Sequence, residues 1–273
     1  MDPRTPARRP VTRAALTAAL ATATCLGAAL PATAAPAAPA AAHHRTTATG
    51  GGWSQDGLRL NPADNAAVDA YLARARRAER DISPRIRAAA LLTHATVVGF
   101  EQRLKSPDSL KRKVATRMRE TPGQSVQTSL AMINDAVRYT LQWPTGQYTR
   151  GVTAAAGLLS SWGDDSTRWS NTWGRPKGYK GINSAWRAPR SGQVFEVQFH
   201  TPRSKAAQLE THKLYEEQRL PGTPPERVRE LQARQDAIFA AVPVPAGADR
   251  LSAPVRRVPA PAPAPLPARA VTA

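Results

Sequence analysis

Residues 193–201 alternate between apolar and polar side chains, and this segment constrains the fold more than any other stretch of the chain. A period of two places Phe195, Val197 and Phe199 on one face of a β-strand. The polar side chains of the segment share the opposite face: Glu196, Gln198 and His200. One face is therefore suited to a hydrophobic core, and the other is suited to a catalytic or binding site.

Helix and strand signals elsewhere predict an α+β domain, a mixed β-sheet packed by helices. Three helix starts pair a capping side chain with a proline at the first helical position: Asn61–Pro62, Ser83–Pro84 and Ser106–Pro107. A further helix is expected over 203–218, and another after Thr223, because Thr223 and Glu226 have the spacing of a capping box. The expected strands are 130–142, 167–173, 182–188 and 193–201.

The two ends of the chain have compositions unlike that of the middle. Arginines precede an apolar run over 14–30, and small residues then lead to Ala35, which predicts a secretory signal peptide over 1–35 cleaved near Ala35. The run is too short and too alanine-rich for a permanent anchor, so we expect no membrane span and a secreted, extracellular protein, exported by the Sec or the twin-arginine route. Residues 36–52 and 242–273 are rich in alanine and proline and are expected to be a disordered linker and tail around one domain at 53–241.

Charge and cysteine content restrict the partners and the chemistry. The formal net charge of +18 indicates polyanionic partners, which could be nucleic acid, an anionic membrane surface or a phosphorylated substrate. Cys25, the single cysteine, lies in the predicted signal, so the exported chain would have neither disulfides nor a cysteine nucleophile.

Two basic segments are candidate phosphate sites. In 175–183, glycines allow a tight turn that could bring three cations to an anion beside the ring of Tyr179: Arg175, Lys177 and Lys180. Arg103, Lys105 and Lys113 surround the predicted start of a helix, where free N–H groups favour phosphate. The alternative for the second segment is a basic helix with one solvated face.

Asp135 is a single carboxylate in an otherwise apolar predicted strand. It could pair with Arg138 for structural reasons, or it could bind Mg²⁺ together with Glu196, because Mg²⁺ prefers a few carboxylates and phosphate oxygens. The neighbouring phosphate-type segments favour the metal. For Glu196 the alternative is a strand glutamate paired with a lysine.

These segments, in this order, resemble the synthetase domain of the RelA/SpoT family of nucleotide pyrophosphokinases, which have a nucleotidyltransferase-like fold. The resemblance spans about 103–215 and implies a role for each matching residue. Tyr179 matches the tyrosine that stacks on the acceptor base, and Glu196 and Gln198 match a glutamate-valine-glutamine strand. The residues matching the family's ATP-binding set are Arg103, Lys105, Ser109 and Lys113. Those matching its supporting helix are Glu210, His212 and Tyr215.

Three departures from the family pattern bear on the site. Arg175 and Asn183 stand where the family usually has a lysine and a histidine, so acceptor contacts could differ. Asp135 precedes Arg138 by three residues where the family's catalytic aspartate precedes its arginine by five. His200, with His212 and Tyr215, could contact acceptor phosphate or brace the site.

The resemblance implies an ATP:nucleotide 3′-pyrophosphotransferase. It would use Mg²⁺ and move the β,γ-pyrophosphate of ATP to the ribose 3′-hydroxyl of GTP, GDP, ATP, ADP or AMP, with Asp135 and Glu196 as metal ligands and catalytic residues. The acceptor would contact Arg175, Lys177, Tyr179, Lys180, Asn183, Gln198 and His200. A monomer that needs no nucleic acid is favoured. Two alternatives stay open: an exported toxin of the same fold that modifies tRNA 3′ ends or depletes adenine nucleotides, and a non-enzymatic basic protein that binds nucleic acid.

Overall fold

A five-stranded mixed sheet organises the computed structural model, which describes residues 51–218, 220 and 222–255. The strand order is β3-β4-β7-β6-β5, and β4 runs parallel to β7 while the other neighbours are antiparallel. The strands are β3 (Thr96–Val98), β4 (Arg138–Gln142), β5 (Asp165–Asn171), β6 (Ile182–Arg187) and β7 (Val194–His200). The predicted α+β class, a mixed sheet packed by helices, is confirmed.

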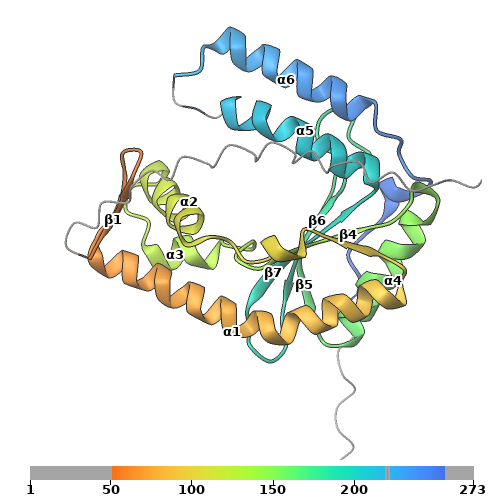
Figure 1. The fold of residues 1–273 in the computed structure, drawn as a ribbon, viewed down its shortest axis with the longest axis horizontal. Coiled ribbons are helices and arrows are strands. Elements are labelled where there is room, and N and C mark those ends of the chain that lie inside the picture. The colour runs from red at the N-terminus through yellow and green to blue at the C-terminus, as the bar shows by residue number, and fades with distance from the viewer. Residues whose placement is uncertain (1–50, 219, 221, 256–273) are drawn as a thin grey trace, which may run out of the picture. The chain divides into compact units, whose positions relative to one another are not determined.

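Helices lie on both sides of this sheet (Figure 1). α1 crosses one side, and α5 with α6 lies on the other. The helices are α1 (Pro62–Leu92), α2 (Pro107–Glu120), α3 (Val126–Ala131), α4 (Tyr148–Ser161), α5 (Pro202–Gln218) and α6 (Pro225–Ala240). A hairpin of β1 (Trp53–Gln55) and β2 (Leu58–Leu60) precedes α1, and the short 3₁₀ turns are η1 (Phe100–Gln102), η2 (Thr145–Gln147) and η3 (Ala248–Arg250). None of the helices in the described part is long and apolar enough to cross a membrane.

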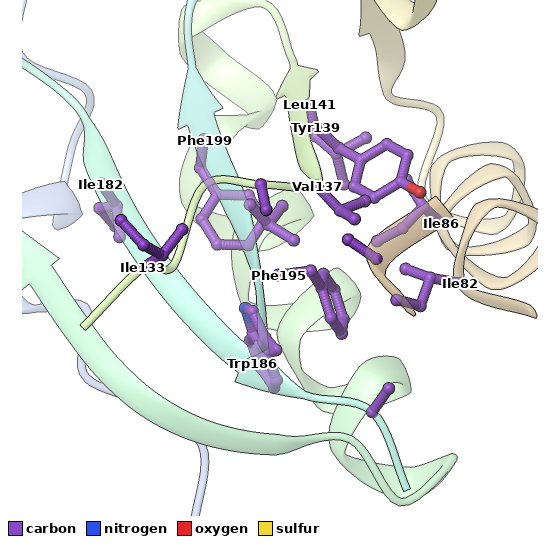
Figure 2. Close-up of a cluster of buried hydrophobic side chains, with 14 of the residues drawn as sticks. Ile82, Ile86, Ile133, Val137, Tyr139, Leu141, Ile182, Trp186, Phe195 and Phe199 are labelled. Atoms are coloured by element: carbon purple, nitrogen blue, oxygen red, sulfur yellow. The ribbon is translucent and has the colours of Figure 1, made fainter. Parts of the chain in front are cut away.

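The core lies between α1 and the apolar face of the sheet (Figure 2). Ile82 and Ile86 of α1 contribute to the same buried cluster as the strand side chains. The predicted apolar face of β7 is confirmed, because its three apolar residues are completely buried: Phe195, Val197 and Phe199. The polar face is only partly open, since Gln198 and His200 are also buried and Ser204 of α5 bonds to His200.

A single helix replaces the two that were predicted over 62–92. α1 continues through Pro84, which was expected to start a second helix. Proline in a helix interior costs one backbone hydrogen bond. The buried stripe stays in phase across it, from Ala75 through Ile82 to Ile86, so continuous packing on the sheet offsets that cost.

The predicted strand 130–142 is wrong over its first half. α3 occupies Val126–Ala131, starting where the Ser125 side chain accepts a hydrogen bond from the Thr128 N–H at 3.1 Å. β4 begins only at Arg138, so Asp135 lies in a loop rather than on a strand. Asp135 therefore precedes β4 in the chain, and its carboxylate lies beside α2, where it pairs with Lys113.

Two smaller expectations also need correction. No capping box forms at α6, because its N-cap is Pro224 and Thr223 Oγ1 instead donates to the Glu217 carbonyl at 2.8 Å. The expected tail began too early, because the folded domain continues past 241 to at least 251: Asn171 Nδ2 donates to the carbonyls of Ala248 at 2.8 Å and Leu251 at 3.0 Å. The predicted signal peptide, most of the linker and residues 256–273 lie outside the described residues.

Candidate active site

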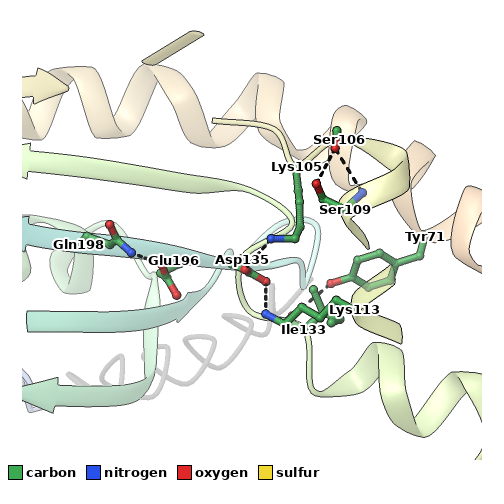
Figure 3. Close-up of polar contacts among 9 residues, drawn as sticks. All are labelled: Tyr71, Lys105, Ser106, Ser109, Lys113, Ile133, Asp135, Glu196 and Gln198. Carbon is green, nitrogen blue, oxygen red and sulfur yellow. Dashed lines mark hydrogen bonds and ion pairs between the residues drawn. The ribbon is translucent and has the colours of Figure 1, made fainter. Parts of the chain in front are cut away.

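A carboxylate held by two lysines forms the centre of the site (Figure 3). Lys105 Nζ lies 3.0 Å from Asp135 Oδ2, and Lys113 Nζ lies 2.8 Å from Oδ1. Burial would raise the pKa of Asp135, but the two ammonium groups outweigh it and hold this pKa at about 2. Asp135 is therefore ionised, and both lysines are drawn to one point.

Backbone contacts fix the positions of these side chains. The Lys105 N–H donates to the Ala136 carbonyl at 3.0 Å, and the Arg138 N–H donates to the Arg103 carbonyl at 2.8 Å. Ser106 caps α2 and its hydroxyl donates to Ser109 Oγ at 2.8 Å, so the predicted ATP-site serine lies in the first turn of α2. The sequence segments 103–113 and 135–138 are thereby joined into one unit.

Arg103 is held by a buried glutamate that the sequence did not single out. Its Nε lies 2.5 Å from Glu79 Oε1 on α1, and Ser83 Oγ donates to the same carboxylate. The guanidinium also lies over the Phe100 ring, 4.4 Å from the centroid. The sequence signal for this pair was the position of Glu79 among the apolar residues of α1 that are buried, because a buried carboxylate needs a cationic or hydrogen-bonding partner.

Glu196 brings a second carboxylate to this region from β7. Gln198 Nε2 donates to its Oε1 at 2.7 Å, and Arg138 is its register partner on β4. Burial raises the pKa of Glu196, and the negative charge of Asp135 raises it further, while Arg138 opposes both. A partly buried carboxylate with a raised pKa is suited to proton transfer.

The loop 175–183 is organised around the hydroxyl of Tyr179. This hydroxyl donates to Asn183 Oδ1 at 2.8 Å and shares a hydrogen bond with His200 Nε2 at 2.8 Å. A side chain on Gly181 would place its Cβ 2.9 Å from Tyr179 Oη, so glycine is required for this close approach. Burial lowers the pKa of His200 to about 3. His200 is therefore neutral and braces Tyr179 rather than offering a positive charge to phosphate.

The three predicted phosphate-binding cations of this loop differ in environment. Lys180 is buried and its Nζ donates to the Arg175 carbonyl, which closes the loop on itself. Arg175 and Lys177 are exposed. Only the latter two are placed to meet a ligand from solvent.

The predicted supporting residues of α5 are exposed at the surface of the helix. His212 is 62% exposed and lies 3.7 Å from Glu216, and Glu210 is also exposed. Tyr215 lines a cavity of about 540 Å³ between α5 and α6, together with Tyr179. The sequence did not assign α6 to this site, although Phe239 packs against the Tyr179 ring with centroids 5.9 Å apart.

The donor set available for a metal is the carboxylate pair Asp135 and Glu196. No group of three histidine, cysteine, aspartate or glutamate side chains with metal-site geometry occurs among the described residues. Two carboxylates are sufficient for Mg²⁺, which completes its coordination with water and phosphate oxygens. The negative charge of Asp135 contributes to the raised pKa of Glu196, and carboxylate oxygens of this kind are the protein ligands that Mg²⁺ prefers.

Comparisons with known proteins found similar solved structures. No protein-family model and no curated protein matches the chain. Small alarmone synthetase 1 from Bacillus subtilis bound to its product pppGpp is 16% identical at a TM-score of 0.45, over 63% of this chain and 90% of that one. A GTP pyrophosphokinase family protein from Streptococcus pneumoniae is 15% identical at a TM-score of 0.45, over 66% and 89%. At these values the function must be argued from the site itself.

Proposed function

We propose that this protein transfers the β,γ-pyrophosphate of ATP to the ribose 3′-hydroxyl of a purine nucleotide and releases AMP. The observation that carries the proposal is the Lys105–Asp135–Lys113 cluster beside Glu196. Two ammonium groups and two carboxylates there supply what phosphoryl transfer needs, which is positioning and charge neutralisation rather than covalent catalysis.

The cationic residues would hold the triphosphate of ATP. Lys105 and Lys113 converge on one point within 3.0 Å of Asp135, and Arg103 is fixed in place by Glu79. Phosphate oxygens can take over the hydrogen bonds that the two lysines now give to Asp135. Mg²⁺, held by Asp135 and Glu196, would neutralise charge on the triphosphate.

Glu196 would act as the general base. The acceptor 3′-oxygen attacks the β-phosphorus, its proton passes to the Glu196 carboxylate, and the bond between the β-phosphorus and the oxygen bridging to the α-phosphate breaks. That oxygen leaves with AMP. The raised pKa of Glu196 increases its ability to accept this proton.

The acceptor would bind along the loop 175–183. Tyr179 would stack on the purine, with its hydroxyl fixed by Asn183 and His200. The exposed cations Arg175 and Lys177 would meet the acceptor phosphates, and Tyr215 would line the same region from α5. We further propose that the protein acts outside the cell after cleavage near Ala35, which rests on the sequence of residues 1–35.

The test is incubation of the protein with Mg²⁺, ATP labelled in its γ-phosphate, and each of GTP, GDP, ATP, ADP and AMP in turn. The proposal expects label in the acceptor with an equal amount of AMP. Label in RNA or a tRNA end, with none in free nucleotides, would favour the toxin. Salt-sensitive nucleic-acid binding without any labelled product would favour the non-enzymatic binding protein.

A further inference from the structure

A cavity among the described residues lies outside the catalytic cluster. It has a volume of about 600 Å³, which is within the size range of small-molecule sites. Its walls come from the first half of α1, from the end of α3 with the loop after it, and from the β6–β7 hairpin. We call it the arginine groove, after three of its lining residues: Arg74, Arg77 and Arg187.

The three arginines line this groove from two facing elements. Arg74 and Arg77 occupy one turn of α1, and Arg187 ends β6 on the facing wall. Among the described residues, Arg74 and Arg77 form no ion pair with a carboxylate, whereas Arg187 Nη1 donates to the Gly192 carbonyl at 3.2 Å and Arg187 lies opposite Asp165 in the strand register. By contrast, Lys111 and Arg112 of α2 pair with Asp69 and Asp56. Arg74 and Arg77 therefore bring two positive charges to the groove that no ion pair within the described residues neutralises, and Arg187 adds a third guanidinium on the facing wall.

The groove also has a carboxylate and a fixed wall. Asp81 lines it but forms no ion pair with the arginines. At the wall, the Tyr71 hydroxyl donates to the Ile133 carbonyl at 3.2 Å (Figure 3). It also accepts from Gln193 Nε2 at 3.2 Å, so α1 is tied to the two other segments. Ile133 is two residues from Asp135, so this wall adjoins the catalytic cluster.

We infer that the arginine groove is a second binding site, which takes the phosphate groups of a small polyphosphorylated ligand. Guanidinium groups present several N–H donors that match phosphate oxygens, and charge-assisted bonds of this kind are strong. Such a ligand is either a nucleoside polyphosphate or an inorganic polyphosphate. Asp81 distinguishes the two, because it can accept from ribose or base donors but repels an inorganic anion. The inference does not depend on the proposed transfer reaction.

The experiment is calorimetric titration of the full chain with GTP and, separately, with inorganic tripolyphosphate, both without Mg²⁺. At least two sites per chain are expected for at least one of the ligands, one in the groove and the rest in the proposed donor and acceptor sites. The double variant Arg74→Ala/Arg77→Ala should lose one site or weaken it at least about tenfold. Arg187→Ala, on the opposite wall, should weaken the same site. The matched control Arg76→Ala/Arg119→Ala removes the same charge from exposed positions outside the groove and should retain every site.

Asp81→Asn then identifies the ligand source. Weaker binding of GTP would indicate a nucleoside polyphosphate, and tighter binding of tripolyphosphate would indicate an inorganic one. The inference is overturned if Arg74→Ala/Arg77→Ala keeps every site with Kd within about twofold of the parent, or if it and the control lose affinity equally. No effect of Asp81→Asn on either ligand would also contradict binding within the groove.

Discussion

The two halves of the candidate active site are organised by different forces. In the donor half, ion pairs hold the side chains: Asp135 with Lys105 and Lys113, and Glu79 with Arg103. In the acceptor half, neutral hydrogen bonds join Tyr179 to Asn183 and to His200. A triphosphate can replace a carboxylate as the partner of a cation, whereas a purine needs a ring fixed in orientation. Each half is therefore held by the kind of interaction that its proposed ligand can use.

The largest expected effect comes from removing the carboxylate of Glu196, the proposed general base. Glu196→Gln should lower kcat by about a hundredfold or more while ATP binding stays near normal, because general-base catalysis contributes roughly 10²–10⁴-fold. Label transfer measures the first quantity and calorimetry the second. The control is Glu120→Gln, which makes the same change at an exposed position of α2 and should alter neither kcat nor ATP binding. Near-normal turnover of the Glu196 variant would rule out the assigned base.

Asp135 tests whether charge organises the donor half. Its pKa of about 2 lies below the unfolded value near 4, so its ionised form stabilises the fold above about pH 4, and this contribution is lost as the pH falls from about 4 to 2. Asp135→Asn should reduce the free energy of unfolding at pH 6 by about 2 kcal/mol, and the difference should shrink near pH 2. Denaturant unfolding at both pH values measures it. A difference that does not vary with pH would mean that the ion pairs contribute no such stability.

Glu79 tests whether Arg103 must be held in place to bind ATP. Glu79→Gln should raise the KM for ATP about tenfold while kcat and the acceptor KM change less than about threefold. Asp164→Asn is a matched control, because Asp164 is another buried carboxylate that pairs with an arginine of α1, Arg85, at 3.0 Å. It should affect stability alone. If the two variants changed the KM for ATP equally, Glu79 would have only a structural role.

Tyr179 tests the neutral half, where the smallest effects are expected. Tyr179→Ala should raise the acceptor KM about tenfold and the ATP KM much less, since base stacking is worth about 1–3 kcal/mol. Tyr179→Phe keeps the ring, so it should leave the acceptor KM within about threefold and cost about 1 kcal/mol of stability through the lost hydrogen bonds. If the alanine variant raised both KM values equally, stacking on the acceptor would be the wrong role.

The sequence predicted the parts of the fold that depend on local pattern. The alternation in β7 identified the buried face, and the Ser106–Pro107 pair located the start of α2. Patterns could not show that α1 runs through Pro84, because tertiary packing decided between a break and a continuous helix. α4 was missed even though its buried residues have helical spacing, from Tyr148 through Val152 to Leu159.

Site residues were predictable where a charge had a specific place in sequence, and less so where the role depends on burial. Lys105 and Lys113 were singled out in one basic segment and Asp135 in another, and the structure brings the two segments together. Glu79 was not singled out, although it falls in the buried stripe of α1, because its pairing with Arg103 appears only in the folded chain. The sequence left two roles open for His200, a contact with phosphate or a brace for the site. Its complete burial keeps it neutral, so it serves as a brace for Tyr179. His212 was expected to support the site, but it lies at the exposed surface of α5.

Parallel reactions with ATP labelled only in the β-phosphate and only in the γ-phosphate test the central claim most directly. Transfer of pyrophosphate predicts that both labels reach the purine nucleotide in equal amounts, that AMP is the co-product, and that Glu196→Gln slows both transfers by about a hundredfold or more. Transfer of the γ-label alone, with the β-label retained in ADP, would show a simple kinase and contradict the account.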